Sequence, residues 1–243
     1  MNSLSDEAII IGLMDYREAD KLVTLFTKEH GKIRGVAKGA KRSQKRFGGA
    51  LELFAKLTVR FIHHEGLSTI QDCDILTIFP NIRYNLEKIT MSGYGAELID
   101  LLSAEECPNQ RLFRLFSSYL EYLDSSVFDI SDRRFFEINL LNILGYRLPI
   151  EHCPKCGRNL AEYGAEWITG NQFIVSCKEC SVGGKSLSPL TIKLMQQSLK
   201  TGHFGTIRFV GSGIDEAGEL IDVTIASNIQ RPLRSLEFIK LYS

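Results

Sequence analysis

Four cysteines in two pairs are the residues of this sequence best suited to joint chemistry. Cys153 and Cys156 form one C-x-x-C pair, Cys177 and Cys180 form a second, and twenty residues separate the pairs. Four soft thiolates at this spacing are typical of a tetrahedral zinc site, and Gly157 favours the turn that aims backbone N–H groups at the first pair. The pattern predicts one structural zinc ion (Zn2+) in a ribbon whose hairpin is the segment AEWITGNQFIVS.

A catalytic zinc site is the first alternative for these cysteines. Catalytic sites usually keep three protein ligands and one open position, and four matched cysteines leave no position open. A nucleobase deaminase would need proline before a C-x-x-C pair, where this chain has His152. His152 would replace a thiolate if one cysteine were not a ligand. The remaining alternative is reduced cysteines without metal, and we expect the lone Cys73 and Cys107 to be small buried residues.

The second notable group of residues is cationic. Residues 28–60 carry ten Lys or Arg against two Glu, a local net charge of +8, although the whole chain has 29 side chains of each sign. The glycines of GKIRGVAKGAKRSQKRFGG favour a mobile loop, and its cations favour phosphate binding, with Phe47 and Phe54 as nearby rings for stacking on bases. Burial in a core is the alternative for Phe54. The candidate DNA-binding residues are Lys32, Arg34, Lys38, Lys41, Arg42, Lys45 and Arg46.

No other combination of residues predicts catalysis. The five histidines have no spacing typical of a triad or a second metal site, and no G-x-x-x-x-G-K-S/T phosphate loop occurs. We therefore expect a binding protein with no catalytic residues, and a zinc-dependent hydrolase is the weaker alternative.

Short apolar runs in the first 80 residues must position the cationic segment. Five candidate strands, rich in Ile, Val, Thr and Phe, lie at residues 7–13, 21–27, 31–37, 51–62 and 66–76. This count predicts a small five-stranded barrel of the OB type, with an SH3-like barrel as the alternative.

Beyond Pro80 the apolar residues recur at the three- and four-residue spacing of helices. The predicted helices cover residues 86–102, 111–123, 132–144 and 188–200, a last one begins near Pro232, and no element is predicted for residues 203–229. The fold class is therefore α+β and multidomain, with an N-terminal OB-fold β-barrel and an all-α helical domain that carries an inserted four-cysteine zinc ribbon. The predicted boundaries are 1–80 for the barrel, 81–150 and 186–243 for the helical domain, and 151–185 for the ribbon.

The apolar segments do not predict a membrane protein. No run of eighteen apolar residues occurs, and Asp6 and Glu7 precede the first apolar stretch, where a signal peptide would be positively charged. We expect a cytoplasmic protein with no membrane partner.

Three stretches, in their order along the chain, resemble the bacterial RecO family of recombination mediators. They are YREADKLVTLFTKEHGKIRGVAKGAKR, RRFFEINLLNILGYRLPIEHCPKCG and RPLRSLEFIKLYS, and the resemblance covers nearly the whole chain. It implies an OB domain that binds single- and double-stranded DNA and anneals complementary strands, with the DNA role on Arg34, Lys38, Lys41 and Arg42. It also implies association with the nucleoid and three protein partners: RecR, the acidic C-terminal tail of single-stranded DNA-binding protein, and RecA as a functional partner.

Arg133 and Arg134 are the candidate residues for binding that tail. They precede the apolar FFE segment, and cations beside an apolar surface suit a peptide that ends in an aromatic residue and a free carboxylate. Ordinary surface charge at the start of a helix is the alternative. For the whole chain, the alternative function is an OB-fold and zinc-ribbon module that binds RNA in translation or transcription, which a preference for RNA over DNA would favour.

Overall fold

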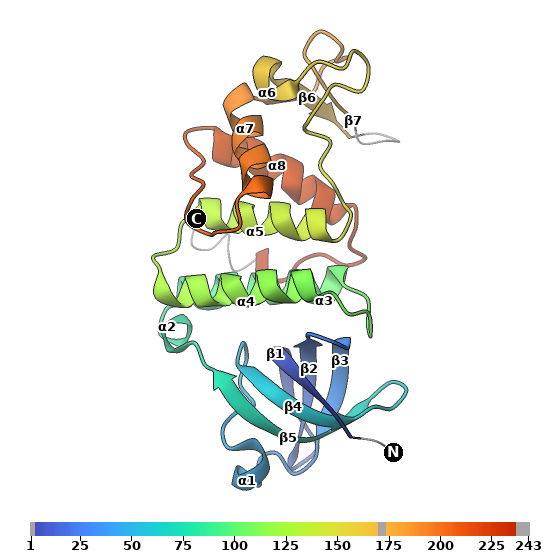
Figure 1. Ribbon diagram of the computed structural model, residues 1–243, viewed down its shortest axis with the longest axis vertical. Helices are drawn as coiled ribbons and strands as arrows, with labels where there is room; N and C mark the ends of the chain where they lie inside the picture. Colours follow the sequence, from blue (N-terminus) through green and yellow to red (C-terminus); the bar gives the residue numbers. More distant parts are fainter. Residues whose placement is uncertain (1–2, 170–173, 237–243) are drawn as a thin grey trace. The chain divides into compact units, whose positions relative to one another are not determined.

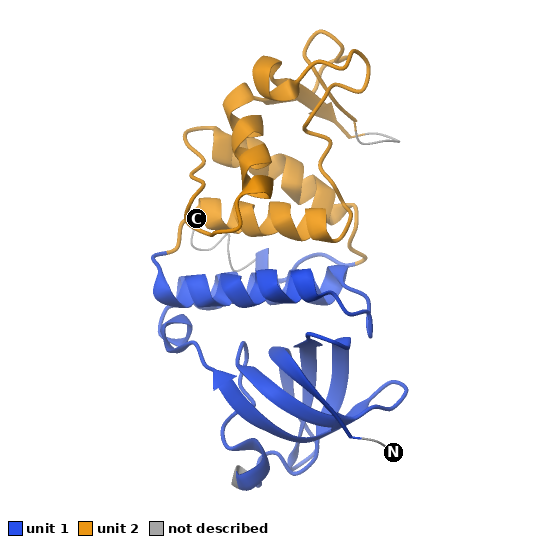
Figure 2. Cartoon of the chain, in the orientation of Figure 1, with its two compact units in different colours: residues 1–127, 231–243 blue, residues 128–230 orange. Residues whose placement is uncertain are grey.

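The computed structural model describes residues 3–169 and 174–236, which form two compact units (Figure 2). The first unit contains residues 1–127 and 231–243, and the second contains residues 128–230. The helices over residues 86–125, which the sequence groups with the helical domain, thus belong to the same unit as the N-terminal strands. Each unit has its own buried core.

Five strands of the first unit close into a barrel (Figure 1). They are β1 (Ser3–Tyr16), β2 (Asp20–Thr27), β3 (Gly31–Ala37), β4 (Lys56–Ile62) and β5 (Ser68–Thr77). Their order around the barrel is β1-β2-β3-β5-β4, with β4 pairing with β1, and the β3–β5 pairing is parallel while the others are antiparallel. This arrangement is the OB fold, so the predicted barrel is confirmed and the SH3-like alternative does not fit.

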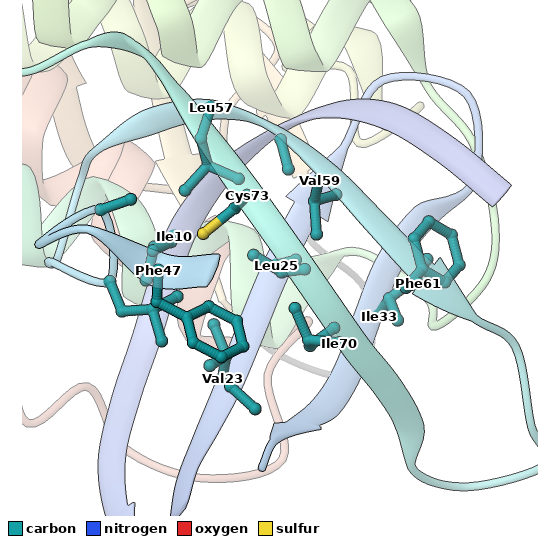
Figure 3. Packing of buried hydrophobic residues seen from close by; sticks show 14 residues of the cluster. Ile10, Val23, Leu25, Ile33, Phe47, Leu57, Val59, Phe61, Ile70 and Cys73 are labelled. Atoms are coloured by element: carbon teal, nitrogen blue, oxygen red, sulfur yellow. The ribbon is translucent and has the colours of Figure 1, made fainter. Parts of the chain in front are cut away.

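Alternate residues of the strands point into the barrel and form its core (Figure 3). Ile10, Leu25, Val59 and Ile70 lie there with at most 1% of their surface exposed. Phe47, from the short helix α1 (Gln44–Phe47), packs into the same cluster. Phe54 is buried as well, so the interpretation of these two rings as stacking surfaces for bases is wrong.

Helices of the first unit cover part of the outer surface of its barrel. They are α2 (Pro80–Arg83), α3 (Leu86–Leu102) and α4 (Gln110–Ser125). The Phe26 ring of β2 packs on Phe113 of α4 with 5.9 Å between ring centroids. Gly31, at φ 73°, allows the backbone of Cys107 to approach the start of β3 closely, because a Cβ atom on residue 31 would lie 2.5 Å from the carbonyl oxygen of Cys107. The apolar outer side of β2 is thus buried at this end of the barrel.

The second unit combines three longer helices with a small ribbon. The helices are α5 (Ile130–Ile143), α7 (Pro189–Lys200) and α8 (Gly213–Ala226). The ribbon contains α6 (Leu160–Tyr163) and a sheet of order β7-β6-β8, from β6 (Ala165–Ile168), β7 (Ile174–Ser176) and β8 (Lys185–Leu187). The predicted hairpin is present, although part of its turn, and most of the helix predicted from Pro232, lie outside the described residues.

Helix α8 lies in the segment for which the sequence predicts no element. Its glycines lower helix propensity by roughly 1 kcal/mol each relative to alanine, but Gly218 is required by packing. A Cβ atom at Gly218 would overlap the guanidinium group of Arg134 from α5. Among the described residues, no helix is both long enough and apolar enough to cross a bilayer.

Candidate nucleic-acid interface and metal centre

The structure brings the four predicted cysteine ligands together. The sulfur atoms of Cys153, Cys156, Cys177 and Cys180 all lie within 4.8 Å of one another, and Cys156 Sγ is 3.6 Å from Cys177 Sγ. Four sulfurs at about 2.3 Å from a central ion would be separated by about 3.8 Å, so this cluster has the dimensions of a tetrahedral thiolate site. His152 instead forms a backbone bridge with Asn159, outside the cluster.

Backbone geometry around the first cysteine pair stabilises thiolates. Gly157 has a φ of 74°, and its N–H donates to the carbonyl oxygen of Cys153. Burial raises the pKa of Cys153, but backbone N–H groups of Cys177, Cys156 and Lys155 outweigh burial and lower that pKa to about 6. Hydrogen bonds to the neighbouring cysteines raise the pKa of Cys180 to about 12. The crowded sulfurs therefore cannot all ionise without a cation.

The two remaining cysteines, Cys73 and Cys107, belong to the first unit, whereas the four-cysteine cluster belongs to the second. Cys73 is buried in the barrel core, where burial and two flanking aspartates raise its pKa to about 12. Cys107 is exposed, so the expectation that it is a buried residue is wrong. Its backbone nevertheless lies against Gly31. This contact explains why the chain around residue 107 lies at the barrel, but it does not explain why residue 107 is a cysteine.

The basic segment forms a loop between β3 and β4 that is held against the β1–β2 hairpin. Gly39 N–H donates to Asp20 Oδ1 (2.8 Å), and Lys41 N–H donates to the carbonyl oxygen of Ala19 (3.0 Å). Arg46 closes the loop, because its Nη2 donates to the carbonyl oxygen of Lys38 (2.8 Å). Arg46 is therefore a positioning residue of the loop.

The other four loop cations, at positions 38, 41, 42 and 45, lie on the surface. Lys41 Nζ is 3.0 Å from Asp15 Oδ2, and Arg42 Nη2 is 4.0 Å from Glu18 Oε2. Exposed pairs of this kind contribute at most about 1 kcal/mol, so incoming phosphates can displace the carboxylates. Within the part of the chain that is described, Lys38 and Lys45 have no ion pair. The loop therefore presents a cationic surface.

Lys32 and Arg34 lie on β3, before the loop, and have different environments. Lys32 is 4% exposed, and its Nζ donates to the carbonyl oxygen of Ser103 (3.0 Å) at the C-terminal end of α3. The same ammonium is 3.3 Å from Asp100 Oδ1, so Lys32 is not available to phosphates. Arg34 is about half-exposed, with its Nε 3.1 Å from Glu105 Oε1. The sequence could not distinguish these two residues, because both point to the outer side of β3.

Arg133 and Arg134 do not form the surface clamp expected from the sequence. Both are buried in the first turns of α5, at 4% and 7% exposure. Arg133 Nε donates to Glu137 Oε1 (2.7 Å) and Arg134 Nη1 to Glu137 Oε2 (2.9 Å). Asp222 of α8 adds a second carboxylate, 3.4 Å from Arg134 Nη1. The i,i+4 and i,i+3 spacing to Glu137 was the available sequence signal for this buried cluster.

A groove of the second unit combines apolar lining with exposed cations, which the buried Arg133 and Arg134 do not provide. A cavity of about 350 Å³ lies between α5, α7 and the segment leading into the ribbon. Ile150 and Ile138 form buried apolar parts of its lining, and its exposed charged residues are Arg147, Lys200 and Glu151. Arg147 Nε donates to Asn142 Oδ1 (3.1 Å), which orients that guanidinium group. Sequence reasoning missed this site because its residues are distant along the chain.

The N-terminal and the C-terminal parts of the chain match models of the same protein family. Residues 1–79 match the family model described as "Recombination protein O N terminal", and residues 83–237 match the model described as "Recombination protein O C terminal". The two matches together span nearly all of the chain. They agree with the resemblance that the sequence motifs carry.

Similar curated proteins extend over the full length of the chain. The "DNA repair protein RecO" of Geobacter metallireducens is 48% identical over 240 residues, which is 99% of this chain and 98% of that protein. The protein of the same name from Geobacter sulfurreducens is 47% identical over 242 residues, with the same coverage. That from Pelobacter propionicus is 38% identical over 238 residues, covering 98% of this chain and 96% of that protein.

The buried cluster on α5 generates a prediction about stability. Glu137→Ala should lower the free energy of unfolding by about 3–5 kcal/mol, because it leaves two buried guanidinium groups without their shared carboxylate. Urea denaturation followed by the fluorescence of Trp167, the single tryptophan and a residue of the same unit, measures the change. Glu219→Ala is the control, since Glu219 is half-exposed and pairs with Lys185 on the surface. Equal losses in the two variants would contradict the assignment.

Proposed function

The chain belongs to the RecO family of DNA repair and recombination proteins, and from this premise we propose that it is a recombination mediator that binds DNA through its OB barrel. The observation that supports this proposal is the cationic loop on the barrel, where Lys38, Lys41, Arg42 and Lys45 face solvent. Cations spaced along a loop neutralise phosphates of any sequence. We expect binding to single- and double-stranded DNA.

Annealing of complementary strands follows from this charge distribution without covalent chemistry. Two DNA strands repel each other because both are polyanions. A protein that neutralises their phosphates and leaves the base edges free lowers the cost of their encounter. In this proposal the protein has no catalytic residues. Membership in a DNA repair family also disfavours the alternative of an RNA-binding module in translation or transcription.

Zinc is the metal that we propose for the four-cysteine site. Its support is the donor set, since four sulfur ligands within 4.8 Å of one another suit a soft tetrahedral ion and leave no open position. Bound there, zinc would link the two halves of the ribbon and stabilise its fold. The four cysteines would hold it, and the proposed role is structural.

The groove lined by Arg147 and Lys200 is the proposed site for the acidic C-terminal tail of single-stranded DNA-binding protein. Its apolar lining suits an aromatic side chain, and the two exposed cations suit a terminal carboxylate. Binding of this tail would bring the mediator to coated single strands. RecR as a direct partner, and RecA as the protein whose loading is assisted, complete the proposal from family membership.

Removing the loop cations should weaken DNA binding for every sequence. For the variant with Lys38→Ala, Lys41→Ala, Arg42→Ala and Lys45→Ala, the slope of log affinity against log salt should flatten by up to about three units, because each lost phosphate contact removes about 0.7 unit for a single strand. Fluorescence anisotropy of a labelled oligonucleotide at several salt concentrations measures this slope.

The matched control removes four exposed cations outside the loop. It carries alanine in place of Arg111, Arg114, Lys178 and Lys193. The control should retain the salt slope of the parent. A loop variant with the parental slope would show that phosphates bind elsewhere on the protein.

Zinc content provides a second measurement. The purified protein should hold about one zinc ion per chain, and Cys153→Ser or Cys177→Ser should remove the ion and lower ribbon stability with little effect on DNA affinity. Metal analysis by mass spectrometry together with DNA titration tests both statements, and Cys107→Ser should retain the ion. Absence of zinc from protein prepared without oxygen would refute the assignment.

The tail site is tested by calorimetry with a synthetic acidic peptide that ends in phenylalanine and a free carboxylate. Arg147→Ala with Lys200→Ala should weaken binding about tenfold or more, because a charge-assisted hydrogen bond is worth roughly 1.5–3 kcal/mol and tenfold corresponds to about 1.4 kcal/mol. Lys193→Ala, an exposed change on the same helix, is the control. Unchanged affinity in the double variant would place the tail elsewhere.

A further inference from the structure

Apolar side chains around α2 and the start of α3 are exposed. The chain leaves β5, passes Ile78, forms α2 and enters α3 through Tyr84 and Asn85 (Figure 1). Tyr84 is 90% exposed and Ile78 is 44% exposed. Leu86 and Ile89 lie one turn apart on α3, at 54% and 37% exposure. Ile78, Tyr84, Leu86 and Ile89 together make up the Tyr84 surface, and exposed apolar groups of this kind mark protein contacts, in which tyrosine often dominates.

A cavity of about 420 Å³ opens beside Tyr84, within the first unit. One wall comes from the α2–α3 junction and includes Lys88, and the other comes from the end of α4 and includes Asp124 and Val127. Most of the lining side chains are polar, whereas Val127 is apolar and 89% exposed. This mixed lining suits a phenol ring, which has an apolar body and a polar tip.

Hydrogen bonds fix the walls of this cavity. Asp124 Oδ1 accepts from the backbone N–H groups of Asn81 (2.8 Å) and Ile82 (3.2 Å). Lys88 Nζ donates to the carbonyl oxygen of Asp124 (3.2 Å), and the buried Ile82 side chain anchors α2. The cavity is therefore formed before any partner binds, which lowers the cost of ordering on binding.

The exposed ring and the cavity are complementary across a two-fold axis. Because Tyr84 is 90% exposed, its ring does not fill the cavity that it borders. A two-fold axis beside the cavity would place the Tyr84 ring of each copy in the cavity of the other. In such an isologous contact the same surface serves both copies, as in most symmetric dimers.

The charges of the Tyr84 surface suit a second copy of the chain rather than a polyanion. Glu87 and Lys88 are neighbours on α3, and Arg83 of α2 forms an ion pair with Glu52. Because the two signs balance, two copies can approach without net repulsion, and Lys88 of each copy can approach Glu87 of the other. Nucleic acid would gain little from a surface without excess positive charge.

We propose that the Tyr84 surface and the cavity beside it form the interface of a symmetric dimer of this chain, in which the Tyr84 ring of each copy occupies the cavity of the other. The exposed apolar area of this surface and Val127 is on the order of 500 Å² per copy, at the low end for specific interfaces. We therefore expect a reversible dimer with a micromolar dissociation constant.

A dimer deepens the proposed annealing function, on which this consequence rests. The Tyr84 surface and the cationic loop belong to the same unit, so that a dimer carries two loops. Each loop can neutralise one strand, and the dimer then holds two strands near each other. The encounter of complementary strands becomes partly intramolecular, which raises their effective concentration.

Sedimentation equilibrium of the full chain tests the dimer. Between about 1 µM and about 100 µM, the mass should rise from 27.4 kDa towards twice that value. Tyr84→Ala should raise the dimer dissociation constant about tenfold or more, because a tyrosine enclosed at the centre of an interface belongs to the residues with the largest effects. Tyr163→Ala, a change of an exposed tyrosine in the second unit, is the matched control and should dimerise like the parent.

Complementation tests the exchange of rings directly. Val127→Trp enlarges a side chain of the lining and should block the cavity while retaining the Tyr84 ring, whereas Tyr84→Ala lacks the ring and retains the cavity. Neither variant can place a ring in a cavity with itself, but a mixed pair can form one such contact. An equimolar mixture should therefore dimerise more strongly than either variant alone. Both positions are about nine-tenths exposed, so both variants should fold like the parent, which thermal unfolding checks.

Annealing rates connect the dimer with the proposed function. At concentrations where the parent is dimeric, Tyr84→Ala should anneal naked strands more slowly than the parent. Its affinity for a single oligonucleotide should stay within about twofold of the parent, because the cationic loop is unchanged.

The outcomes separate this inference from the proposed function. A parent that stays at 27.4 kDa over the whole concentration range would overturn the dimer and leave the Tyr84 surface to a different protein. A dimer that Tyr84→Ala does not weaken, or a mixture no stronger than its components, would overturn the assigned interface. A parent that dimerises but binds no DNA would instead refute the proposed function and leave the dimer standing.

Discussion

The buried ammonium of Lys32 sets the boundary between the covered and open parts of the barrel surface. Its Nζ donates to backbone carbonyl groups at the C-terminal end of α3, where the helix dipole favours a cation. Because outward positions of a strand recur every second residue, Arg34 follows at the edge of the helical cover and Val36 lies beyond it. The Lys32 contact thus joins α3 to β3, and the loop after β3 begins beyond the surface that α3 covers.

Cations serve opposite purposes in the two units, and burial determines which. In the loop after β3 they are exposed and weakly paired, so that phosphates can compete for them. In α5, Arg133 and Arg134 are buried and share Glu137, and both arginines also pair with Asp222 of α8. The loop cations remain available to a polyanionic ligand. The two arginines of α5 are instead neutralised by these carboxylates, and their ion pairs hold α5 and α8 together.

Local patterns of the sequence predicted the barrel, most helices and the ligands of the four-cysteine cluster. Alternation, helical spacing and the C-x-x-C pairs are all determined by neighbouring residues. The errors concern tertiary contacts: Lys32 and Arg34 share one strand face, but only packing by α3 separates them. Likewise, Gly218 lowers the helix propensity of α8, but its missing side chain leaves room for the guanidinium group of Arg134, which lies 84 positions earlier in the sequence. The groove with Arg147 and Lys200 could not be predicted either, because tertiary contacts bring its lining residues together.

In the proposed function, the protein neutralises phosphates and leaves base edges free, and it thereby anneals complementary strands. The most direct measurement is the rate at which two complementary oligonucleotides, each coated with the cognate single-stranded DNA-binding protein, form a duplex with and without the protein, followed by fluorescence quenching. We expect the protein to accelerate duplex formation without any nucleotide cofactor, for naked and for coated strands, and we expect that acceleration to be lost as salt rises. Unchanged rates for both kinds of strand at low salt would contradict it.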